Sequence, residues 1–266
     1  MNVLNKVMKP SDGVAWITGA SGGIGRAVTL KLAARGWTVY ASARRLDQLK
    51  QLAREAMGRG KIIPLPLDVT DLAACREAIE TIERDHPLAL AILNAGIYTP
   101  MRAIDFKAET ASKMLRVNLD GVTNMIDAIL PKLIDRKTGH VALTSSVAGY
   151  RGLPDAAVYS ATKAGLIAMA ESLAIDGPDL GIRFSVINPG FVETEATAVN
   201  GFEMPFLMQP EDAADKIVGG LFKPGFEIAF PWIFIRILRA IGLLPNRWYI
   251  ALQRKALGWD GSNAER

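Results

Sequence analysis

The stretch Val14-Ala-Trp-Ile-Thr18, followed by Gly19-Ala-Ser-Gly-Gly-Ile-Gly25, decides the fold of this chain. Its first five residues form an apolar run typical of a buried strand, and residues 22–35 follow with a helical pattern of apolar side chains. Glycines between a strand and a helix permit a tight turn. They also let the backbone approach a pyrophosphate at the positive helix N-terminus. We therefore predict a dinucleotide-binding loop here, although such glycines also occur in plain turns.

Strands and helices alternate outward from this loop. Alternation without a long run of either kind predicts an α/β fold: a doubly wound, Rossmann-type parallel sheet of about seven strands, covered by helices on both faces. We expect strands at 14–18, 38–43, 61–67, 88–93, 140–144, 182–188 and 226–230. We expect helices at 22–35, 46–57, 71–85, 110–129, 156–175 and 211–221. The prediction is a single Rossmann domain over residues 10–230, with a C-terminal amphipathic extension over 231–266.

Composition supports one globular domain. The chain has 266 residues, of which 50% are hydrophobic and 22% charged, and these values exclude disordered, collagen-like and coiled-coil proteins. The lone cysteine, Cys75, cannot form an internal disulfide, which favours a reducing compartment. The two histidines, His86 and His140, leave no His/Cys cluster for a metal. We therefore expect a cytoplasmic protein without a metal site.

The positive charge is concentrated at the C-terminal end. Residues 1–222 carry 24 basic and 24 acidic side chains, whereas residues 223–266 carry seven basic and three acidic ones. These cations are too few and too scattered for a nucleic-acid surface. The most apolar stretch, 228–244, is broken by Pro231, Arg236 and Arg239, so no membrane span is expected.

The extension carries aromatic and basic residues together. Residues 233–244 are almost wholly apolar, residues 247–257 read as a second short helix, and five basic residues lie among Trp232, Trp248, Tyr249 and Trp259. This pattern fits an amphipathic segment in a membrane interface. It fits equally a flap over the pocket or a surface packed against a second subunit. The sequence leaves these alternatives open.

The end of the second strand bears on the choice of dinucleotide. An NAD site would place a carboxylate there for the ribose 2′-hydroxyl, but this chain has Arg44 and Arg45 after Ala41-Ser-Ala43. Two guanidinium groups suit a 2′-phosphate, which predicts NADP(H), unless the arginines are simply solvated at a helix start. Asp68, after the third strand, is expected to accept a hydrogen bond from the adenine amino group. A helix cap is the alternative role for this acidic cluster.

Polar residues gather at the expected carboxyl ends of later strands, where ligands bind in doubly wound folds. Asn94-Ala-Gly96 ends the fourth strand, Ser145 and Ser146 end the fifth, and Asn188-Pro-Gly190 ends the sixth. Tyr159 and Lys163 are four residues apart on a predicted helix, so they share one face. A Tyr/Lys pair at this spacing is common by chance and decides nothing alone.

The complete set of motifs resembles the classical short-chain dehydrogenase/reductase family over roughly residues 10–222. The shared motifs occur in the family's order and spacing: Thr18-Gly-x-x-x-Gly-x-Gly25, Asp68, Asn94-Ala-Gly96, Asn118, Ser146, Tyr159-x-x-x-Lys163 and Pro189-Gly-x-Val-x-Thr194. The resemblance selects Ser146 over Ser145 and implies a catalytic set of Asn118, Ser146, Tyr159 and Lys163. It implies cofactor contacts from Gly19, Ser21, Gly22, Ile24, Arg44, Arg45, Asp68, Val69, Asn94, Ala95, Gly96, Tyr159, Lys163, Pro189, Gly190, Val192 and Thr194. It also implies a homodimer or homotetramer.

The side chains suggest a reaction. A carbonyl that receives a hydride develops negative charge on oxygen and needs a hydrogen-bond donor and a proton. Tyr159 can supply the proton, Ser146 can orient the substrate oxygen, and a cationic Lys163 favours the phenolate. By resemblance, Lys163 also binds the nicotinamide ribose, and Asn118 holds a water that connects the lysine to solvent.

The substrate is expected to be a hydrophobic carbonyl or alcohol. Residues 195–209 correspond by resemblance to a mobile lid and are apolar at Val199, Phe202, Met204, Phe206 and Met208. Tyr98 is placed to line the same pocket. The alternative is that these apolar residues pack on the core.

Two other functions compete with the oxidoreductase. One is a catalytically silent NADP(H)-binding regulatory or scaffold protein, which would not require Ser146 or Asn118. The other is sugar-nucleotide epimerase or dehydratase chemistry on the related extended fold, for which the chain lacks a large C-terminal substrate domain.

Overall fold

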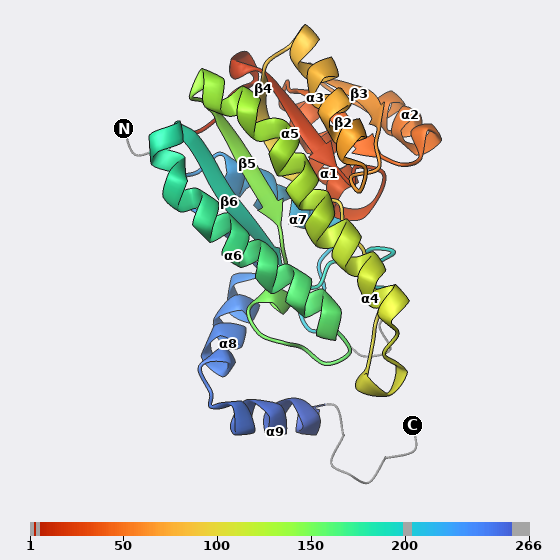
Figure 1. Ribbon diagram of the computed structural model, residues 1–266, viewed down its shortest axis with the longest axis vertical. Coiled ribbons are helices and arrows are strands. Elements are labelled where there is room, and N and C mark those ends of the chain that lie inside the picture. The colour runs from red at the N-terminus through yellow and green to blue at the C-terminus, as the bar shows by residue number, and fades with distance from the viewer. Residues whose placement is uncertain (1–2, 4–5, 199–203, 257–266) are drawn as a thin grey trace.

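A computed structural model describes residues 3, 6–198 and 204–256 and confirms the predicted fold class. Seven strands form one parallel sheet in the order β3-β2-β1-β4-β5-β6-β7 (Figure 1). The order reverses between β1 and β4, and this reversal opens a crevice at the carboxyl ends of these strands. The strands are β1 Val14–Thr18, β2 Thr38–Ala43, β3 Lys61–Pro66, β4 Leu88–Leu93, β5 Gly139–Thr144, β6 Ile182–Pro189 and β7 Glu227–Phe230.

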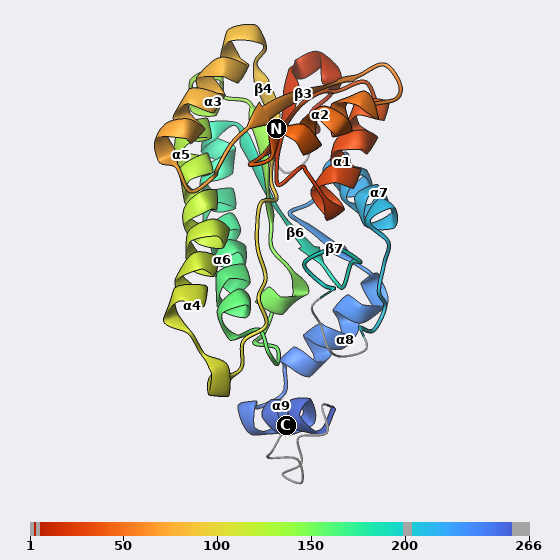
Figure 2. The same ribbon diagram turned by 90° about the vertical axis from the view of Figure 1, so that its right-hand side faces the viewer.

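Helices cover both faces of the sheet (Figure 2). On one face, α1 Gly23–Ala34, α2 Leu46–Arg54 and α7 Pro210–Leu221 enclose a core that includes Val28, Leu49 and Ile217. On the other, α3 Leu72–Asp85, α5 Gly121–Arg136 and α6 Ala157–Leu180 enclose a core that includes Ile79 and Ile129. The short 3₁₀ turns are η2 Pro10–Asp12, η3 Ala103–Asp105 and η5 Val147–Gly149. The central strands β1 and β4 are buried on both faces, and their sequences are almost continuously apolar.

The helical region predicted at 110–129 is longer and less regular than expected. It consists of α4 Ala108–Leu115, the π-helical segment η4 Arg116–Asp120, and α5, with no break between them. A π turn inserts an extra residue into the helical repeat and is frequent at functional sites. Here it carries Asn118, which is fully buried.

The extension begins directly after β7 and contains two helices. α8 spans Trp232–Gly242 and α9 spans Asn246–Ala256. α9 lies across one end of the molecule, beyond the carboxyl ends of the strands (Figures 1 and 2). Among the helices of the described residues, none is long and apolar enough to cross a membrane. The predictions made for Val199, Phe202 and Trp259 lie outside the described residues.

Candidate active site

A cavity of about 670 Å³ runs along the carboxyl ends of β1, β2, β4, β5 and β6. It brings together every residue predicted to contact the cofactor, and it also reaches Ser146. Its two ends are chemically distinct. Arg44, Arg45 and Asp68 line one end, and Ser146, Tyr159 and Lys163 line the other, with the glycine loop between them. Asn118 is the one predicted site residue that does not line it.

The glycine loop is fixed to the end of β4 by backbone and side-chain hydrogen bonds. The N–H groups of Asn94 and Ala95 donate to Thr18 Oγ1 at 3.0 and 3.1 Å, and Asn94 Nδ2 donates to the Thr18 carbonyl at 3.2 Å. Gly19 has φ +67°, and a Cβ on Gly25 would lie 2.2 Å from the Gly19 carbonyl oxygen. Two of the glycines are therefore required by the packing of the loop itself, before any ligand is considered.

The arginine end of the cavity is open and positively charged. Arg44 and Arg45 are exposed, and neither guanidinium forms a hydrogen bond or ion pair with another described residue. Asp68 Oδ1 accepts hydrogen bonds from the N–H and the hydroxyl of Thr70 at 2.9 and 2.8 Å, and these bonds, with a smaller contribution from Arg44, hold the pKa of Asp68 below its ordinary value. The helix cap falls instead to Asp71, which accepts from the N–H of Ala74.

Tyr159 projects from the first turn of α6 towards the loop after β5. Its hydroxyl lies beside the Ser146 side chain, and its ring packs edge-on against Tyr98 with 4.9 Å between the ring centroids. Burial raises the pKa of Tyr159 to about 12, and Tyr98 adds to this rise while Ser146 opposes it. The phenol is therefore protonated near neutral pH. Ser145 is not equivalent to Ser146, because its hydroxyl is buried and donates to the Lys163 carbonyl at 2.7 Å.

Lys163 is buried one turn further along α6. Its ammonium donates to the Thr144 carbonyl at 2.9 Å and lies 5.5 Å from the centroid of the Tyr159 ring. Burial lowers the pKa of Lys163 to about 8. The cationic form therefore predominates at pH 7, but burial makes it less stable than an exposed ammonium.

Asn118 does not line the cavity, but its side chain bonds to the backbone of Ile97, which does. Its side chain accepts a hydrogen bond from the Ile97 N–H at 2.8 Å and donates to the Ile97 carbonyl at 2.9 Å and to Thr162 Oγ1 at 3.2 Å. Its amide and Lys163 Nζ lie on the same side of Gly96. The side chain of Asn118 therefore positions the segment that follows β4.

The apolar lid residues do not behave as one group. Met208 packs partly buried against the core, and its N–H donates to the Phe191 carbonyl at 3.0 Å, so it matches the packing alternative. Phe206 is exposed, and its ring packs at a tilt against Phe234 of α8, with 5.7 Å between the ring centroids. The part of the lid that the structure describes thus contacts both the core and the extension.

The extension is attached to the loop that follows Ser146. Arg151 donates to the carbonyls of Gly242 and Leu244 at 2.7 and 2.8 Å, and its guanidinium lies 4.0 Å from the centroid of the Tyr249 ring. The Tyr249 hydroxyl donates to the Gly152 carbonyl at 2.7 Å. The turn between α8 and α9 is therefore held against the loop that follows Ser146.

Glu227 makes a second attachment at the edge of the sheet. It accepts hydrogen bonds from Tyr150, from Asn188 at 2.7 Å and from Arg239 of α8. Burial works to raise the pKa of Glu227, but these three donors outweigh it and hold the pKa below its ordinary value. The carboxylate is therefore ionised and joins α8, β6 and the Ser146 loop.

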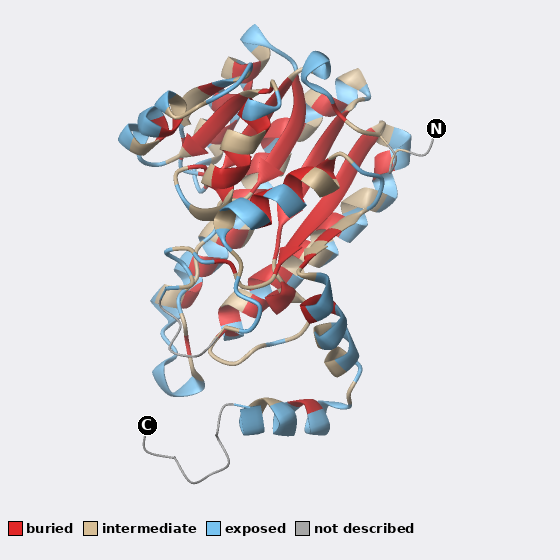
Figure 3. Ribbon diagram, turned by 180° about the vertical axis from the view of Figure 1, so that it is seen from behind, coloured by how far each residue is buried: buried red, intermediate tan, exposed pale blue. Residues whose placement is uncertain are grey.

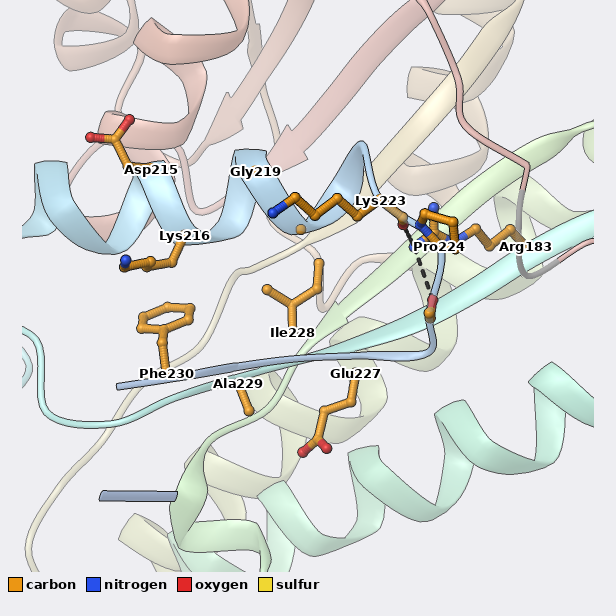
Figure 4. Close-up of a pocket in the computed structure, with 12 residues that line it drawn as sticks. Arg183, Asp215, Lys216, Gly219, Lys223, Pro224, Glu227, Ile228, Ala229 and Phe230 are labelled. Carbon is orange, nitrogen blue, oxygen red and sulfur yellow. Dashed lines mark hydrogen bonds between the residues drawn. The ribbon is translucent and has the colours of Figure 1, made fainter. Parts of the chain in front are cut away.

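A second cavity, of about 450 Å³, lies between α7 and β7 and contains none of the predicted site residues (Figure 4). Arg183 at its border is buried and donates to four backbone carbonyls, those of Lys6, Leu221, Lys223 and Gly225. Glu227 points to the opposite face of β7 from Ile228 (Figure 4). The buried charge in this region therefore holds the turn after α7.

Sequence reasoning missed several residues of the main cavity. Lys113 and Arg116 line it from α4 and η4, and Thr144 lines it beside Lys163. The spacing of three residues between Lys113 and Arg116 places them on one helical face, and this signal was available in the sequence. The Thr144 carbonyl gave no signal, because any residue type supplies one.

Comparisons with known proteins agree with this geometry. A family model described as short chain dehydrogenase matches residues 13–202. An uncharacterized oxidoreductase of Myxococcus xanthus is 40% identical over 243 residues, which cover 91% of this chain and 96% of the relative.

Two solved structures are similar over most of the chain. The alcohol dehydrogenase of Thermococcus sibiricus, complexed with 5-hydroxy-NADP, has a TM-score of 0.74 and 28% identity, covering 82% of this chain and 95% of its own. A 3-oxoacyl-[acyl-carrier protein] reductase of Brucella melitensis with bound NAD has a TM-score of 0.71 and 26% identity, covering 84% and 95%.

Proposed function

This chain belongs to the short-chain dehydrogenase family, and we propose that it is an NADP(H)-dependent oxidoreductase acting on the carbonyl or alcohol group of a hydrophobic substrate. One observation carries the proposal. A single cavity has two arginines that pair with no other described residue at one end and a Tyr–Ser–Lys group at the other, with a glycine loop at a helix N-terminus between them. This order matches the phosphates and nicotinamide of an extended dinucleotide.

The residues present fit such a cofactor. Gly22 is the N-cap of α1 and has no side chain that could cap the helix. A Cβ built on it would have no atom within 4 Å, so the loop leaves room at the helix N-terminus. Unpaired N–H groups of a first helical turn bind phosphate oxygens. Arg44 and Arg45 would hold a 2′-phosphate, while Val192 and Thr194 would lie along the nicotinamide. The two similar structures hold different nicotinamide cofactors, so the choice of NADP(H) rests on the two arginines.

Tyr159 and Ser146 would act on the substrate oxygen. When bound, the cofactor supplies or accepts the hydride. In reduction, Ser146 and Tyr159 would donate hydrogen bonds to the carbonyl oxygen, and the Tyr159 phenol would transfer its proton as negative charge develops there. In oxidation, Tyr159 would act in its phenolate form and accept the proton of the alcohol. A preference for NADPH favours reduction.

Lys163, one turn after Tyr159 on α6, would assist the transfer of the Tyr159 proton. A phenol whose pKa lies near 12 is a weak acid, and a cation close to it stabilises the phenolate. Lys163 is the cation that α6 places there, and it remains charged below a pH of about 8. Its ammonium would also donate to ribose hydroxyls at the nicotinamide end of the cavity. Asn118 would fix the backbone after β4 against which this end is built.

A hydrophobic substrate is favoured by the surroundings of Ser146. Tyr98 and Tyr159 form an aromatic wall, and Phe191, Phe206 and Phe234 form an aromatic group beside the same loop. We also propose a homodimer or homotetramer, as expected from the family. The catalytically silent alternative has less support, because cofactor binding alone gives no reason for Ser146, Tyr159 and Lys163 to meet.

The test is NADPH oxidation by the purified protein with a panel of hydrophobic ketones, aldehydes and quinones. Tyr159→Phe removes the transferable proton but keeps the ring, so turnover should fall by about 10²–10⁴-fold while NADPH affinity stays within about twofold. Tyr40→Phe, which changes a distant buried tyrosine, is the matched control and should keep full turnover. Equal turnover in wild type and Tyr159→Phe would refute the proposed chemistry.

Cofactor choice is tested by Arg44→Ala. Loss of one charge-assisted contact to the 2′-phosphate should lower the ratio of NADPH to NADH affinity by about tenfold. Lys50→Ala removes an exposed cation of α2 that does not line the cavity and serves as control. An unchanged ratio in Arg44→Ala would show that the arginine does not select the cofactor.

A further inference from the structure

Exposed apolar side chains are concentrated at one end of the molecule. Of the sixteen large hydrophobic residues exposed in the described part of the chain, eleven lie on α8, α9 and the turn between them, on lid residues 206–207, or on residues 104–106. These segments all lie at the end where the strands terminate (Figures 1 and 2). Single exposed apolar side chains are ordinary, but their concentration at one end of the molecule marks an interaction site.

The inner faces of the two helices are already occupied by the chain itself. Phe234 and Ile235 of α8 are buried against Val147, next to Ser146. Tyr249 of α9 is buried and bonded to Gly152, and Arg151 bonds the turn between the helices. These contacts fix the orientation of both helices. The outward faces are therefore a defined surface rather than an undocked flap.

The outward faces combine large apolar side chains with cations. Trp232 and Trp248 are 65% and 58% exposed, and Leu243 in the turn is 87% exposed. Figure 3 shows that most of α9 is exposed. Residues 231–256 contain five basic side chains and no acidic one. Arg239 is paired with Glu227, and the other four, Arg236, Arg247, Arg254 and Lys255, are exposed.

Arginine and tryptophan are also paired on this surface. Arg236 lies 6.0 Å from the centroid of the Trp232 ring, and Arg247 lies 5.8 Å from that of Trp248. Indole rings prefer the boundary between headgroups and acyl chains, and neighbouring cations bind anionic headgroups. Short amphipathic helices with this composition lie in the plane of a membrane interface.

We propose that the outward faces of α8 and α9 dock this protein on an anionic lipid bilayer. The charge of the surface selects this occupant over a second copy of the chain, because two such faces would bring eight exposed cations together with no acidic residue of 231–256 to pair them. Docking would place the loop after Ser146 at the membrane. A hydrophobic substrate could then pass from the lipid to the cavity. The docking itself does not depend on the proposed reaction.

Vesicle sedimentation with the full chain tests the proposal. We expect binding to vesicles of phosphatidylglycerol and phosphatidylcholine to exceed binding to pure phosphatidylcholine by at least tenfold, and to weaken as salt rises from 0.05 to 0.5 M. Arg247→Gln/Arg254→Gln/Lys255→Gln should lower binding to the anionic vesicles by about tenfold or more, because each cation near such a surface contributes on the order of 1 kcal/mol. Trp248→Ser should lower it as well.

Matched controls lie at the opposite end of the sheet. Lys50→Gln/Arg59→Gln/Lys61→Gln removes three exposed cations, and Met57→Ser removes an exposed apolar side chain, without touching the extension. Both should bind vesicles like the wild type. NADPH affinity and the melting temperature, measured for every variant, confirm that each one is folded.

Two outcomes would overturn the proposal. One is a folded wild type that does not sediment with anionic vesicles, or whose vesicle-bound fraction equals that of the α9 variants. The other is a Trp248→Ser variant that changes oligomeric mass in light scattering while vesicle binding stays intact, which would assign the surface to a second copy. Vesicle binding without any oxidoreductase activity would still support the docking and would count only against the proposed function.

Discussion

The two halves of the cavity are built in different ways. The half proposed to bind the cofactor, the cofactor half, consists mainly of backbone: the glycine loop, the Asn94–Gly96 segment and the N-terminus of α1, joined by hydrogen bonds to Thr18 and to carbonyls. The substrate half consists of side chains from distant parts of the chain. Tyr159 comes from α6, Ser146 from the loop after β5, and that loop is held by α8 and α9.

This difference teaches where each half is sensitive to change. Where backbone segments touch, there is no room for an added atom. Substitutions in the cofactor half are therefore expected to cause steric clashes that lower both folding stability and cofactor binding. A side-chain site depends on individual groups and on whatever keeps them in place. We expect substitutions in the substrate half to separate activity or local order from global stability, and substitutions in the cofactor half to change them together.

The largest effect on stability is expected in the cofactor half. In Gly25→Ala, the new Cβ would lie 2.2 Å from the Gly19 carbonyl oxygen and 2.6 Å from Asn94 Nδ2. Overpacking of this kind should cost about 3 kcal/mol or more of unfolding free energy and reduce NADPH binding with it. Gly219→Ala in α7 meets no atom within 4 Å and should be neutral or stabilising by up to about 1 kcal/mol. Denaturant unfolding and NADPH titration measure both, and a normal Gly25→Ala protein would contradict the steric account.

A smaller effect, on local rather than global stability, is expected where Arg151 joins the extension to the loop after Ser146. Arg151→Ala removes three hydrogen bonds and the contact with Tyr249, so the local opening of α9 should become easier by about 2 kcal/mol. Amide hydrogen exchange should increase over residues 246–256, while β1 and α1 keep their protection. Arg236→Ala, on the outward face of α8, is the control and should leave exchange unchanged. Equal protection in Arg151→Ala and wild type would show that the arginine does not hold the extension.

The smallest effect should have the opposite sign. Burial holds the pKa of Lys163 at about 8 in the folded chain, against an ordinary value of 10.5 in the unfolded chain. Near pH 7 the buried charge therefore destabilises the cofactor-free fold. Lys163→Met should raise its unfolding free energy by about 1–2 kcal/mol even though turnover is lost.

The pH dependence of this gain follows from proton binding. Between pH 8 and 10.5 the unfolded lysine holds a proton that the folded one has released, so the wild type gains stability from this group as the pH rises. The advantage of Lys163→Met should shrink over that range in thermal melts. An advantage that is constant with pH would mean that the effect comes from packing rather than charge.

The sequence predicted the fold, and the residues that it marked for the cofactor all line one cavity. Short continuous apolar runs located all seven strands, and apolar residues at helical spacing located the helices between them, because burial constrains residue type directly. Most errors lay at the ends of elements, as at α2, which stops at Arg54 rather than Met57, before Gly58 with φ +102°. The π-helical segment within the region predicted at 110–129 was missed as well. Gly19 and Gly25 were predictable for a related reason, since the close approach of backbone at these two positions leaves no room for a Cβ.

The sequence could not reveal contacts that any residue type can make or that join distant segments. The hydrogen bond from Lys163 to the Thr144 carbonyl could not be predicted from the sequence. The same holds for the two hydrogen bonds between the Asn118 side chain and the backbone of Ile97. The expectation that a cationic Lys163 favours the phenolate of Tyr159 left out burial, which raises the pKa of Tyr159 to about 12. Burial is a property of the assembled chain.

The amphipathic extension shows the division most clearly. Its sequence determined that one face of each helix must be apolar and that cations lie among the aromatics, because residue type and spacing carry that information. Which face turns inward was decided only by the tertiary structure, through Arg151, Tyr249 and the aromatic group around Phe234. The physical reason is that packing depends on which surfaces meet, and segments nearly a hundred residues apart meet only once the sheet has formed.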